Sequence, residues 1–316
     1  ETIRTIHRIR TSTIAGSLRC TAAMLNAPDA ATLRLRGAPP MASLCLNEEA
    51  PMDPRLTITR TGPVAEVMLN RPDKRNALDL DLFDALAAAG ESLKGANGLR
   101  AVILHGAGAA FCAGIDTSEF MRMAQNLASV KAEMLAPTPG TANRFQRPVT
   151  VWAELGVPVI AALHGVAFGA GMQLALGADF RIAAPDTRLS IMEARWGLIP
   201  DMGITQTLPR LMRMDLAKEL ILTARVLEAP EALDLGLLTR LADDPLAEAR
   251  AMAARFAAIS PDVLRAGKRL VEETWTLPPG LGLNIEATLQ ANLIASPNQI
   301  EAVMAGMQNR PPQFKG

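Results

Sequence analysis

The sequence predicts an α/β core followed by a helical C-terminal section. Two short runs, Ala101–Leu104 (AVIL) and Val157–Leu163 (VPVIAAL), are apolar throughout, as in strands that helices cover on both faces. Helical periodicity separates these runs, and from Asp215 onward the chain is almost entirely helical in pattern. Strands that alternate with helices, followed by helices alone, are typical of this fold class. The length of 316 residues, 49% of them hydrophobic, is enough for a sizeable core.

The core begins with a predicted β-hairpin. Arg55–Arg60 (RLTITR) and Val64–Leu69 (VAEVML) both alternate between apolar and polar residues, and the segment between them, Thr61–Pro63 (TGP), is a turn sequence. A helix should follow, because an acidic start at Asp79–Asp84 introduces apolar residues at helical spacing. These apolar residues are Leu80, Phe83, Leu86, Ala87 and Leu93.

The remaining elements follow from periodicity and from glycine and proline positions. A helix is expected from Thr117 to about Leu135, and Ala136–Pro148, which contains prolines and a glycine, is expected to form a loop or lid. A helix of small residues should follow the second apolar run and end at Leu176. Further strands are expected at Phe180–Ala184 and Leu189–Ile191. The C-terminal helices are expected at 215–224, 229–236, 245–258, 261–274 and 282–306.

Residues 1–51 are expected to form an unstructured arm outside the fold. They include six arginines and show no sustained helical or strand period. An arginine-rich, acid-poor leader is typical of an organelle transit peptide, which would place the protein in mitochondria. We favour the alternative of a leader that is foreign to the native protein, with the natural start near Met41 or Met52 and a cytoplasmic location. The folded part then divides into a core at 52–244 and a helical region at 245–316.

The composition argues against several classes of function. Lysine and arginine together number 32, as do aspartate and glutamate, so no net field favours nucleic acid or a membrane surface. Three cysteines and three histidines are too few for a disulfide framework or a metal cluster. No apolar run approaches the about 18 residues of a membrane span. We therefore expect no metal, no nucleic-acid partner and no membrane anchor.

Two glycine-containing turns follow the apolar strands, at Gly106–Asp116 (GAGAAFCAGID) and Gly165–Gly171 (GVAFGAG). A dinucleotide-binding loop requires G-x-G-x-x-G, but Phe111 takes the third glycine position of the first turn and the second turn has another spacing. The sequence therefore argues against an NAD site. Each turn leads a strand into a helix and leaves free backbone N–H groups, which stabilise developing negative charge. The pair predicts an oxyanion site, and tight packing of small residues is the alternative.

Four segments of the chain form an ordered set. They are Leu69–Asp79 (LNRPDKRNALD), Ala110–Phe120 (AFCAGIDTSEF), Ala161–Asp179 (AALHGVAFGAGMQLALGAD) and Ile191–Arg210 (IMEARWGLIPDMGITQTLPR). In this order and at these separations they resemble the signature segments of the enoyl-CoA hydratase/isomerase (crotonase) family. The resemblance implies a spiral of β-β-α units and an acyl-CoA thioester substrate, with no cofactor besides the coenzyme A of that substrate. It also implies that the helical region at 245–316 helps to build a homo-trimer or hexamer.

The resemblance further implies a thioester enolate whose oxygen is held by two backbone N–H groups. The first donor would be Ile115, which follows Gly114, and the second would be Ala170, in the middle of Gly169–Gly171. Related sequences usually have glycine in this middle position, so Ala170 must keep a helical φ. Lys74 or Arg75 would be placed to meet a phosphate of the coenzyme A. The full set of implied substrate contacts is Lys74, Arg75, Ala77, Ala113, Gly114, Gly169 and Gln173.

The acidic residues should decide the reaction. Hydratases of this family usually carry one glutamate two positions after the glycine run, where this chain has Gln173, and a second that matches Glu193. Asp201 follows within E-x-x-x-G-L-x-x-D-x-G, which resembles the dienoyl-CoA isomerases, where an acid pair moves protons between the ends of a conjugated enolate. We therefore expect Glu193 and Asp201 to be catalytic in a dienoyl-CoA isomerase. The alternative is an enoyl-CoA hydratase in which Asp201, or a water bound to Gln173, replaces the missing acid.

Physical chemistry supports these two acids independently. Both stand in a stretch of apolar and turn residues, where partial burial raises a carboxyl pKa into the range useful for proton transfer. Two nearby carboxylates also push their pKa values apart, which gives one acid and one base. The structural alternatives are an ion pair from Glu193 to Arg188 or Arg195, and a helix cap from Asp201 ahead of 202–208.

Other readings have less support. A dehalogenase that uses an aspartate nucleophile would need aromatic residues around the substrate ring, and the chain has only eight phenylalanines and three tryptophans. A CoA- or RNA-binding homologue without turnover fits poorly with the retained glutamate and the balanced charge. His164 and Cys112 are expected to serve packing. Met121, Met123 and Met134 could line an acyl tunnel or form a plain packing stripe.

Overall fold

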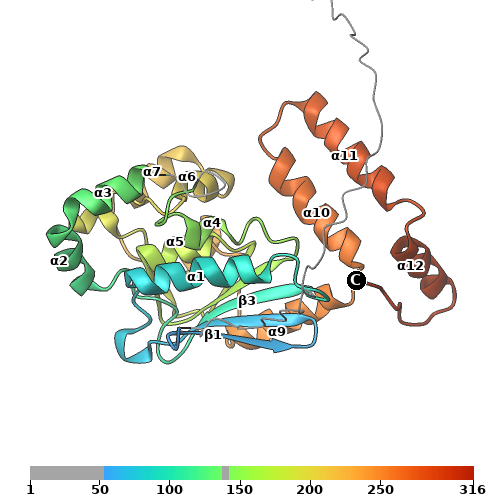
Figure 1. The fold of residues 1–316 in the computed structure, drawn as a ribbon, viewed down its shortest axis with the longest axis horizontal. Coiled ribbons are helices and arrows are strands. Elements are labelled where there is room, and N and C mark those ends of the chain that lie inside the picture. Colours follow the sequence, from blue (N-terminus) through green and yellow to red (C-terminus); the bar gives the residue numbers. More distant parts are fainter. Residues whose placement is uncertain (1–52, 137–141) are drawn as a thin grey trace, which may run out of the picture. The chain divides into compact units, whose positions relative to one another are not determined.

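The computed structural model describes residues 53–136 and 142–316, and the predicted arm at 1–51 lies outside this part. Six strands form the main sheet in the order β1-β2-β3-β4-β6-β9, in which only β1 is antiparallel to its neighbour (Figure 1). These strands are β1 (Leu56–Thr61), β2 (Val64–Leu69), β3 (Ala101–Gly106), β4 (Val159–Leu163), β6 (Phe180–Ala183) and β9 (Arg240–Leu241). The predicted hairpin and both apolar strands are confirmed.

A second sheet has the order β5-β7-β8 and contains β5 (Val166–Phe168), β7 (Arg188–Ser190) and β8 (Leu227–Glu228). Consecutive strands are shared between the two sheets, because β4 and β6 join the main sheet while β5 and β7 join the small one. A helix, α5 (Ala170–Leu176), then returns the chain to the main sheet. This is the expected spiral of β-β-α units. Three strands were not predicted: β5, which lies inside a glycine-containing turn, and β8 and β9, which have two residues each in a region expected to be helical.

The two faces of β3 show why its first four residues, Ala101–Leu104, are all apolar. Val102 and Leu104 belong to the large core cluster that includes residues of α1 (Leu80–Leu93). Ile103 lies in a second cluster with residues of α9 (Pro245–Ala257). Alternate side chains of a strand point to opposite faces, so a strand covered by a helix on each face has no polar side. Figure 1 shows α1 and α9 on the two sides of the sheet.

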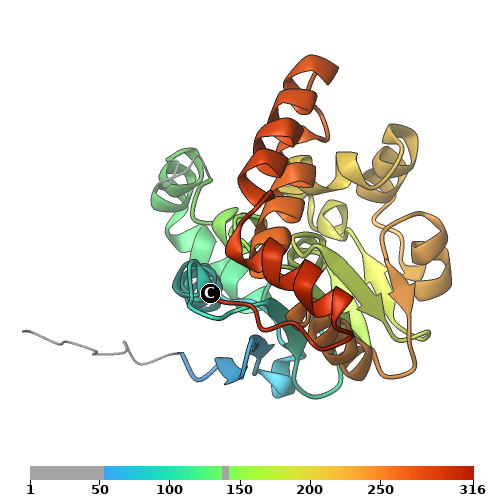
Figure 2. The ribbon, with the colours of Figure 1, turned by 90° about the vertical axis from the view of Figure 1, so that its right-hand side faces the viewer.

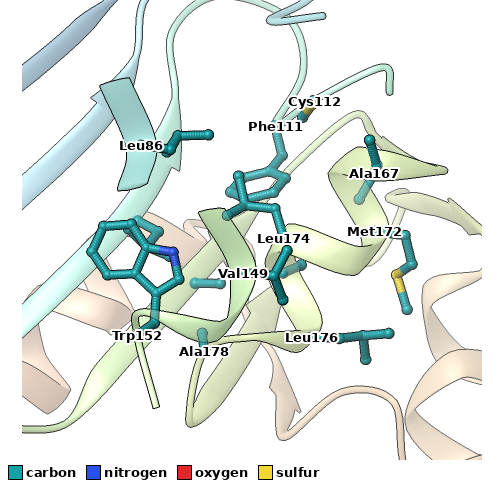
Figure 3. Packing of buried hydrophobic residues seen from close by; sticks show 14 of the residues in the cluster. Leu86, Phe111, Cys112, Val149, Trp152, Ala167, Met172, Leu174, Leu176 and Ala178 are labelled. Carbon is teal, nitrogen blue, oxygen red and sulfur yellow. The ribbon is translucent and has the colours of Figure 1, made fainter. Parts of the chain in front are cut away.

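The helix α5 is buried at all of its positions, which fixes the place of its N-terminus. Figure 3 shows Leu174 of this helix beside Phe111, and Met172 and Trp152, the latter from the segment after α4 (Arg147–Thr150), belong to the same core cluster. Gly171 permits the close approach, since a Cβ at this position would lie 2.5 Å from the Cys112 carbonyl oxygen. The packing of α5 therefore holds one of the two glycine-containing turns in place.

Two long helices that the sequence predicts are interrupted. The expected helix 282–306 is instead α11 (Pro279–Leu293) and α12 (Pro297–Met307), because Ala295 adopts a φ of 61° and Pro297 begins a new helix capped by Ser296. The expected helix 117–135 is likewise α2 (Thr117–Gln125) and α3 (Leu127–Leu135). At the break between α2 and α3, the Asn126 side chain donates to the Arg122 carbonyl at 3.1 Å, which competes with the helical backbone bonding.

The other C-terminal helices agree with the sequence prediction. They are α7 (Met214–Thr223), α8 (Ala229–Asp234), α9, and α10 (Pro261–Thr274), which packs beside α11 (Figure 2). The short helices are η1 (Pro72–Lys74), η2 (Glu193–Trp196), α6 (Ile204–Thr207) and η3 (Leu208–Arg210). The predicted loop at 136–148 is described from Ala142 onward, and α4 begins within it. No helix in the described ranges is long and apolar enough to cross a membrane.

Lys268 joins α10 to the core, so its removal should be costly. Its ammonium group is nearly buried and donates to the carbonyls of Trp152 (2.9 Å) and Val157 (3.1 Å) and to Asp179 (2.7 Å). Lys268→Met should lower the free energy of unfolding by about 3–5 kcal/mol, because Asp179 is left buried without its cation. Urea unfolding followed by circular dichroism measures this loss.

A matched control is Lys94→Met, which removes a more exposed ammonium that pairs with Glu91 and Glu154. This control should change the free energy of unfolding by less than about 1 kcal/mol. Adding Asp179→Asn to Lys268→Met should recover part of the loss, since the unpaired charge disappears. Equal losses for Lys268→Met and Lys94→Met would contradict the anchoring role of Lys268.

Candidate active site

The two glycine-containing turns lie against each other. Cys112 and Ala167 form an isolated parallel bridge, and the Phe168 amide donates to the Cys112 carbonyl at 3.1 Å (Figure 3). Gly114 has a φ of 102°, and a Cβ there would lie 2.9 Å from the Phe168 carbonyl oxygen and 3.9 Å from the Ala170 nitrogen. This close approach and the positive φ both require glycine. The turns that carry the two predicted oxyanion donors are therefore neighbours in space.

The amides of Ile115 and Ala170 are both available as donors. Ala170 is the first residue of α5 and keeps the helical backbone that an alanine needs, whereas Gly169 before it has a φ of 49°. Within the described part of the chain, neither amide donates to a protein acceptor. Free N–H groups in such turns are suited to a negatively charged oxygen. Whether both amides meet at one oxygen stays a prediction.

Glu193 lies beside the second turn. A Cβ on Gly169 would be 3.4 Å from Glu193 Oε1, and this oxygen accepts a hydrogen bond from Gln173 Nε2 at 2.7 Å. The other oxygen, Oε2, is buried and has no hydrogen-bond partner among the described residues. Burial raises the pKa of the Glu193 carboxyl, and the charge of Asp201 adds to this rise. The alternative ion pair with Arg188 or Arg195 does not form.

Asp201 has the environment of a second acid. Its residue is exposed at the surface, yet the protein around it desolvates the carboxyl enough to raise its pKa. The helix-cap interpretation is wrong, because α6 begins at Ile204 with Gly203 as the N-cap and no side-chain cap. Asp201 therefore has no structural task in starting that helix, and its charge acts on Glu193.

The predicted coenzyme A contacts adjoin the first turn. The Ala113 amide donates to the Arg75 carbonyl at 2.9 Å, so the loop that contains Lys74, Arg75 and Ala77 is bonded to the oxyanion turn. Lys74 and Arg75 are exposed, and within the described ranges neither forms an ion pair. Two positively charged side chains without ion-pair partners on one loop are suited to bind a phosphate group.

Comparison with known proteins identifies the family. The model of the enoyl-CoA hydratase/isomerase family matches residues 59–316. The chain belongs to this family. The mitochondrial methylglutaconyl-CoA hydratase of mouse is 32% identical over 256 residues, which cover 78% of each chain. The human mitochondrial enoyl-CoA hydratase domain-containing protein 2 is 32% identical over 260 residues, covering 80% of this chain and 86% of that protein.

Solved structures of the enoyl-CoA hydratase/isomerase family have the same fold. The enoyl-CoA hydratase of Bacillus anthracis superposes with a TM-score of 0.75 at 31% identity and covers 83% of this chain and 99% of its own. That of Mycobacterium tuberculosis gives 0.72 at 29% identity, with 84% and 100% covered. The protein is thus an enzyme of the enoyl-CoA hydratase/isomerase family, and the expected crotonase-like fold is confirmed.

The sequence analysis missed a polar residue that joins the coenzyme A loop to the first turn. Asn76 is fully buried with a φ of 57°; its side chain accepts from the Arg71 amide at 2.8 Å and donates to the carbonyls of Ala107 (2.9 Å) and Ala110 (2.7 Å). An asparagine can both donate and accept here, and it tolerates the left-handed backbone better than most residues. A single buried asparagine after the charged run Asp73–Arg75 gives no periodic signal, so its role is not visible in the sequence.

A second missed link in this family member is Arg71. Its guanidinium contacts Asp79 (3.1 Å) and Asp116 (3.0 Å) and donates to the Ala77 carbonyl at 2.6 Å. Asp79 and Asp116 are the N-caps of α1 and α2, so one arginine fixes the starts of both helices. The start of α2 directly follows Ile115, which connects Arg71 to the oxyanion turn.

Arg71→Met should lower the free energy of unfolding by about 1–3 kcal/mol, because two partly buried carboxylates lose a charged donor. It should also lower kcat/KM on acyl-CoA by up to about 10²-fold, since the coenzyme A loop and the oxyanion turn lose a shared anchor. Urea unfolding and steady-state kinetics measure the two effects. The control Arg213→Met removes an exposed arginine that pairs only with Asp215 and should leave both quantities unchanged. Unchanged kcat/KM in Arg71→Met would refute the link to the turn.

The surroundings of Cys112, His164 and the methionines bear on the roles expected for them. Cys112 is fully buried, which raises its pKa to about 12 and leaves the thiol unreactive. His164 is only half-buried, and its ring bonds the Gly108 carbonyl oxygen at 3.0 Å. Met123 packs against the core while Met121 is exposed. Across 53–136 and 142–316, no three His, Cys, Asp or Glu side chains are grouped to hold a metal ion.

A pocket of about 990 Å³ has other walls than this site, although it reaches Gly203, two residues after Asp201. Its walls are α10 with Lys268, Trp275 directly after this helix, and the segments around Thr150, Arg181 and Arg210. Glu193, Ile115 and Ala170 are not among its lining residues. The two turns are the better candidate for the active site, because free backbone donors and carboxyls with raised pKa values lie near each other there.

Proposed function

We propose that this enzyme moves double bonds in an unsaturated acyl-CoA, converting a 3,5-dienoyl-CoA into the 2,4-dienoyl-CoA. The observation that carries the proposal is the pair Glu193 and Asp201, each with a raised pKa, next to a neutral Gln173. A double-bond shift needs one group that removes a proton from one carbon and a second group that delivers a proton to another carbon farther along the chain. The site offers two such acids and no further acid at position 173.

The proton balance of this reaction fits the positions of the two acids. The thioester oxygen would accept from the Ile115 and Ala170 amides, which lowers the free energy of the enolate. Glu193, beside Gly169, would remove the proton from C2 with its unpartnered Oε2. The electron pair then spreads through the conjugated chain, and Asp201 would deliver a proton to C6. Because Asp201 is exposed, it can regain its proton from solvent.

A spectral assay tests the proposal. We expect 3,5-dienoyl-CoA to develop the longer-wavelength absorbance of a diene conjugated with the thioester, without uptake of water. In deuterium oxide the product should carry deuterium at C6. An enzyme that leaves 3,5-dienoyl-CoA unchanged but bleaches the conjugated absorbance of 2-enoyl-CoA would overturn the isomerase assignment.

The second candidate is enoyl-CoA hydratase, favoured by the names of the similar proteins in mouse and Bacillus anthracis. In this reaction Glu193 would protonate C2 while Asp201, or a water on the remaining N–H of Gln173, supplies the second group. The Gln173 carboxamide already bonds at both ends, which leaves it one free N–H for a water. Hydration of 2-enoyl-CoA in the same assay decides between the two reactions.

We also propose that the substrate is an acyl-CoA thioester, that no cofactor beyond its coenzyme A takes part, and that Lys74 and Arg75 contact its phosphates.

We propose that the protein assembles into a homo-trimer or hexamer through 245–316. Exposed apolar side chains in this region, among them Val271, Trp275 and Met307, support this assembly. Light scattering should give three or six times 33.6 kDa. A cytoplasmic location remains our first choice and a mitochondrial one the alternative.

A further inference from the structure

Gln173 connects the two acidic segments of the site. It lies in α5, is 1% exposed, and its carboxamide makes two hydrogen bonds. Nε2 donates to Glu193 Oε1 at 2.7 Å, and Oε1 accepts from the Met202 amide at 2.8 Å. A peptide N–H can only donate, so the carbonyl end must face Met202 and the amino end must face Glu193. The orientation of the carboxamide is therefore fixed by its partners.

These bonds leave the two oxygens of Glu193 unequal. Oε1 is occupied by Gln173, whereas Oε2 is buried without any partner in the described residues. An acceptor with no donor in a desolvated place is the oxygen that gains most from taking a proton. The same glutamine holds Met202, whose neighbour Asp201 carries the second carboxyl. One side chain thus acts on both acids.

Resting on the proposed function, we propose that Gln173 is a positioning residue for proton transfer. It aims Glu193 Oε2 at the substrate and, through the Met202 amide, holds Asp201 at a fixed distance from Glu193. An amide suits this position, because it donates at one end, accepts at the other and does not titrate. A carboxylate at 173 would stand about 2.7 Å from Glu193 Oε1, and the two would compete for one proton.

Electrostatics supports this role. The Gln173 hydrogen bond lowers the pKa of Glu193 and so opposes the rise that burial causes. Asp201 raises the pKa of Glu193 only when Asp201 itself is ionised, so a protonated Asp201, the form that can deliver a proton, leaves Glu193 a stronger acid than an ionised Asp201 does. The Gln173 hydrogen bond therefore favours the ionised form of Glu193, which is the form that acts as the base.

The test compares Gln173→Met and Gln173→Glu with the wild-type enzyme. The first readout is the titration of Glu193 by ¹³C NMR on protein labelled at the glutamate carboxyls, with Glu193→Gln to assign the signal. We expect the Glu193 midpoint to move to higher pH in both variants, since one loses the donor and the other adds a like charge. The second readout is kcat for 3,5-dienoyl-CoA across pH, which should fall about 10- to 100-fold near neutrality.

The control is Gln206→Met, which removes an exposed glutamine bonded only to Thr205 and should change neither readout. If both Gln173 variants titrate Glu193 as the wild type does, the positioning role is refuted, whatever their stability. If Gln173→Glu gains hydration of 2-enoyl-CoA at an unchanged Glu193 midpoint, position 173 is a vacant acid site and the proposal fails. The NMR titration needs no turnover, so an error in the assigned reaction would leave this test readable.

Discussion

Replacing Glu193 by glutamine should lower kcat on 3,5-dienoyl-CoA by about 10²–10⁴-fold with little change in substrate affinity. Glutamine keeps the size of the side chain and can still accept from Gln173 Nε2, but it can neither take nor return a proton at the position of Oε2. The coenzyme A loop at 72–77 is untouched, so binding of the thioester should persist. Steady-state kinetics on the purified variant measures both parameters.

The pH dependence gives this prediction a second signature. Glu193 must be ionised to act as the base, so kcat of the wild type should rise with pH through the pKa of Glu193, above the usual range of a glutamate. Burial also means that the folded state binds this proton more tightly than the unfolded chain. The carboxyl therefore favours folding at low pH and loses that contribution as pH rises through its folded pKa. Glu193→Gln should consequently not lower the melting temperature at neutral pH.

Asp201→Asn should cost a similar factor in isomerisation, whereas Glu193 alone could still exchange the C2 proton with solvent deuterium. The double variant should lose much less than the product of the two single losses, since one missing acid already breaks the cycle. The exposed Asp215, which pairs with Arg213, provides a control, because Asp215→Asn should leave kcat unchanged. If Asp201→Asn leaves kcat unchanged while Glu193→Gln is inactive, the isomerase assignment is wrong. A hydratase with one catalytic acid would then be the better account.

The parts of this fold that were predictable are those that burial marks in the sequence. β4 and the first four residues of β3 are buried and apolar, and a buried strand of this kind is visible in the sequence as an apolar run. The helix breaks at Asn126 and Ala295 were not visible, because each depends on a local side-chain bond or a positive φ inside an otherwise helical pattern. β8 and β9 are too short for a period to appear.

The candidate site also has parts that were predictable from the sequence and parts that were not. The two turns that contain Ile115 and Ala170 were predictable because glycine-containing turns after buried strands have a sequence signal, whereas the choice of these two residues as donors came from the family resemblance. Gln173 was assigned to substrate contact, but its side chain is taken up by Glu193 and Met202, a pairing that sequence spacing does not encode. Arg71 was missed for the same reason, since its partners are fixed by the fold and not by a repeat.

Replacing Ala170 by proline should lower kcat by at least about 10²–10³-fold, the loss expected when one donor of an oxyanion site is removed. Proline lacks the backbone N–H, and its fixed φ suits the first position of a helix, which Ala170 occupies in α5. The preceding Gly169 gives the backbone the freedom that a residue before proline needs. The donor can therefore be deleted while α5 stays in place.

Two variants separate the missing donor from other effects of the ring. Ala170→Gly keeps the N–H and should retain kcat within a few-fold, although glycine makes the start of α5 more flexible. The proline ring also brings a Cδ to the place of the amide hydrogen, so the loss in Ala170→Pro includes some crowding of the thioester oxygen. Raman spectroscopy of a bound acyl-CoA separates these contributions, because hydrogen bonding lowers the carbonyl stretching frequency. We expect a lower frequency in the wild type and in Ala170→Gly than in Ala170→Pro. Equal frequencies in all three proteins, or a fully active Ala170→Pro, would show that the Ala170 amide does not hold the enolate oxygen.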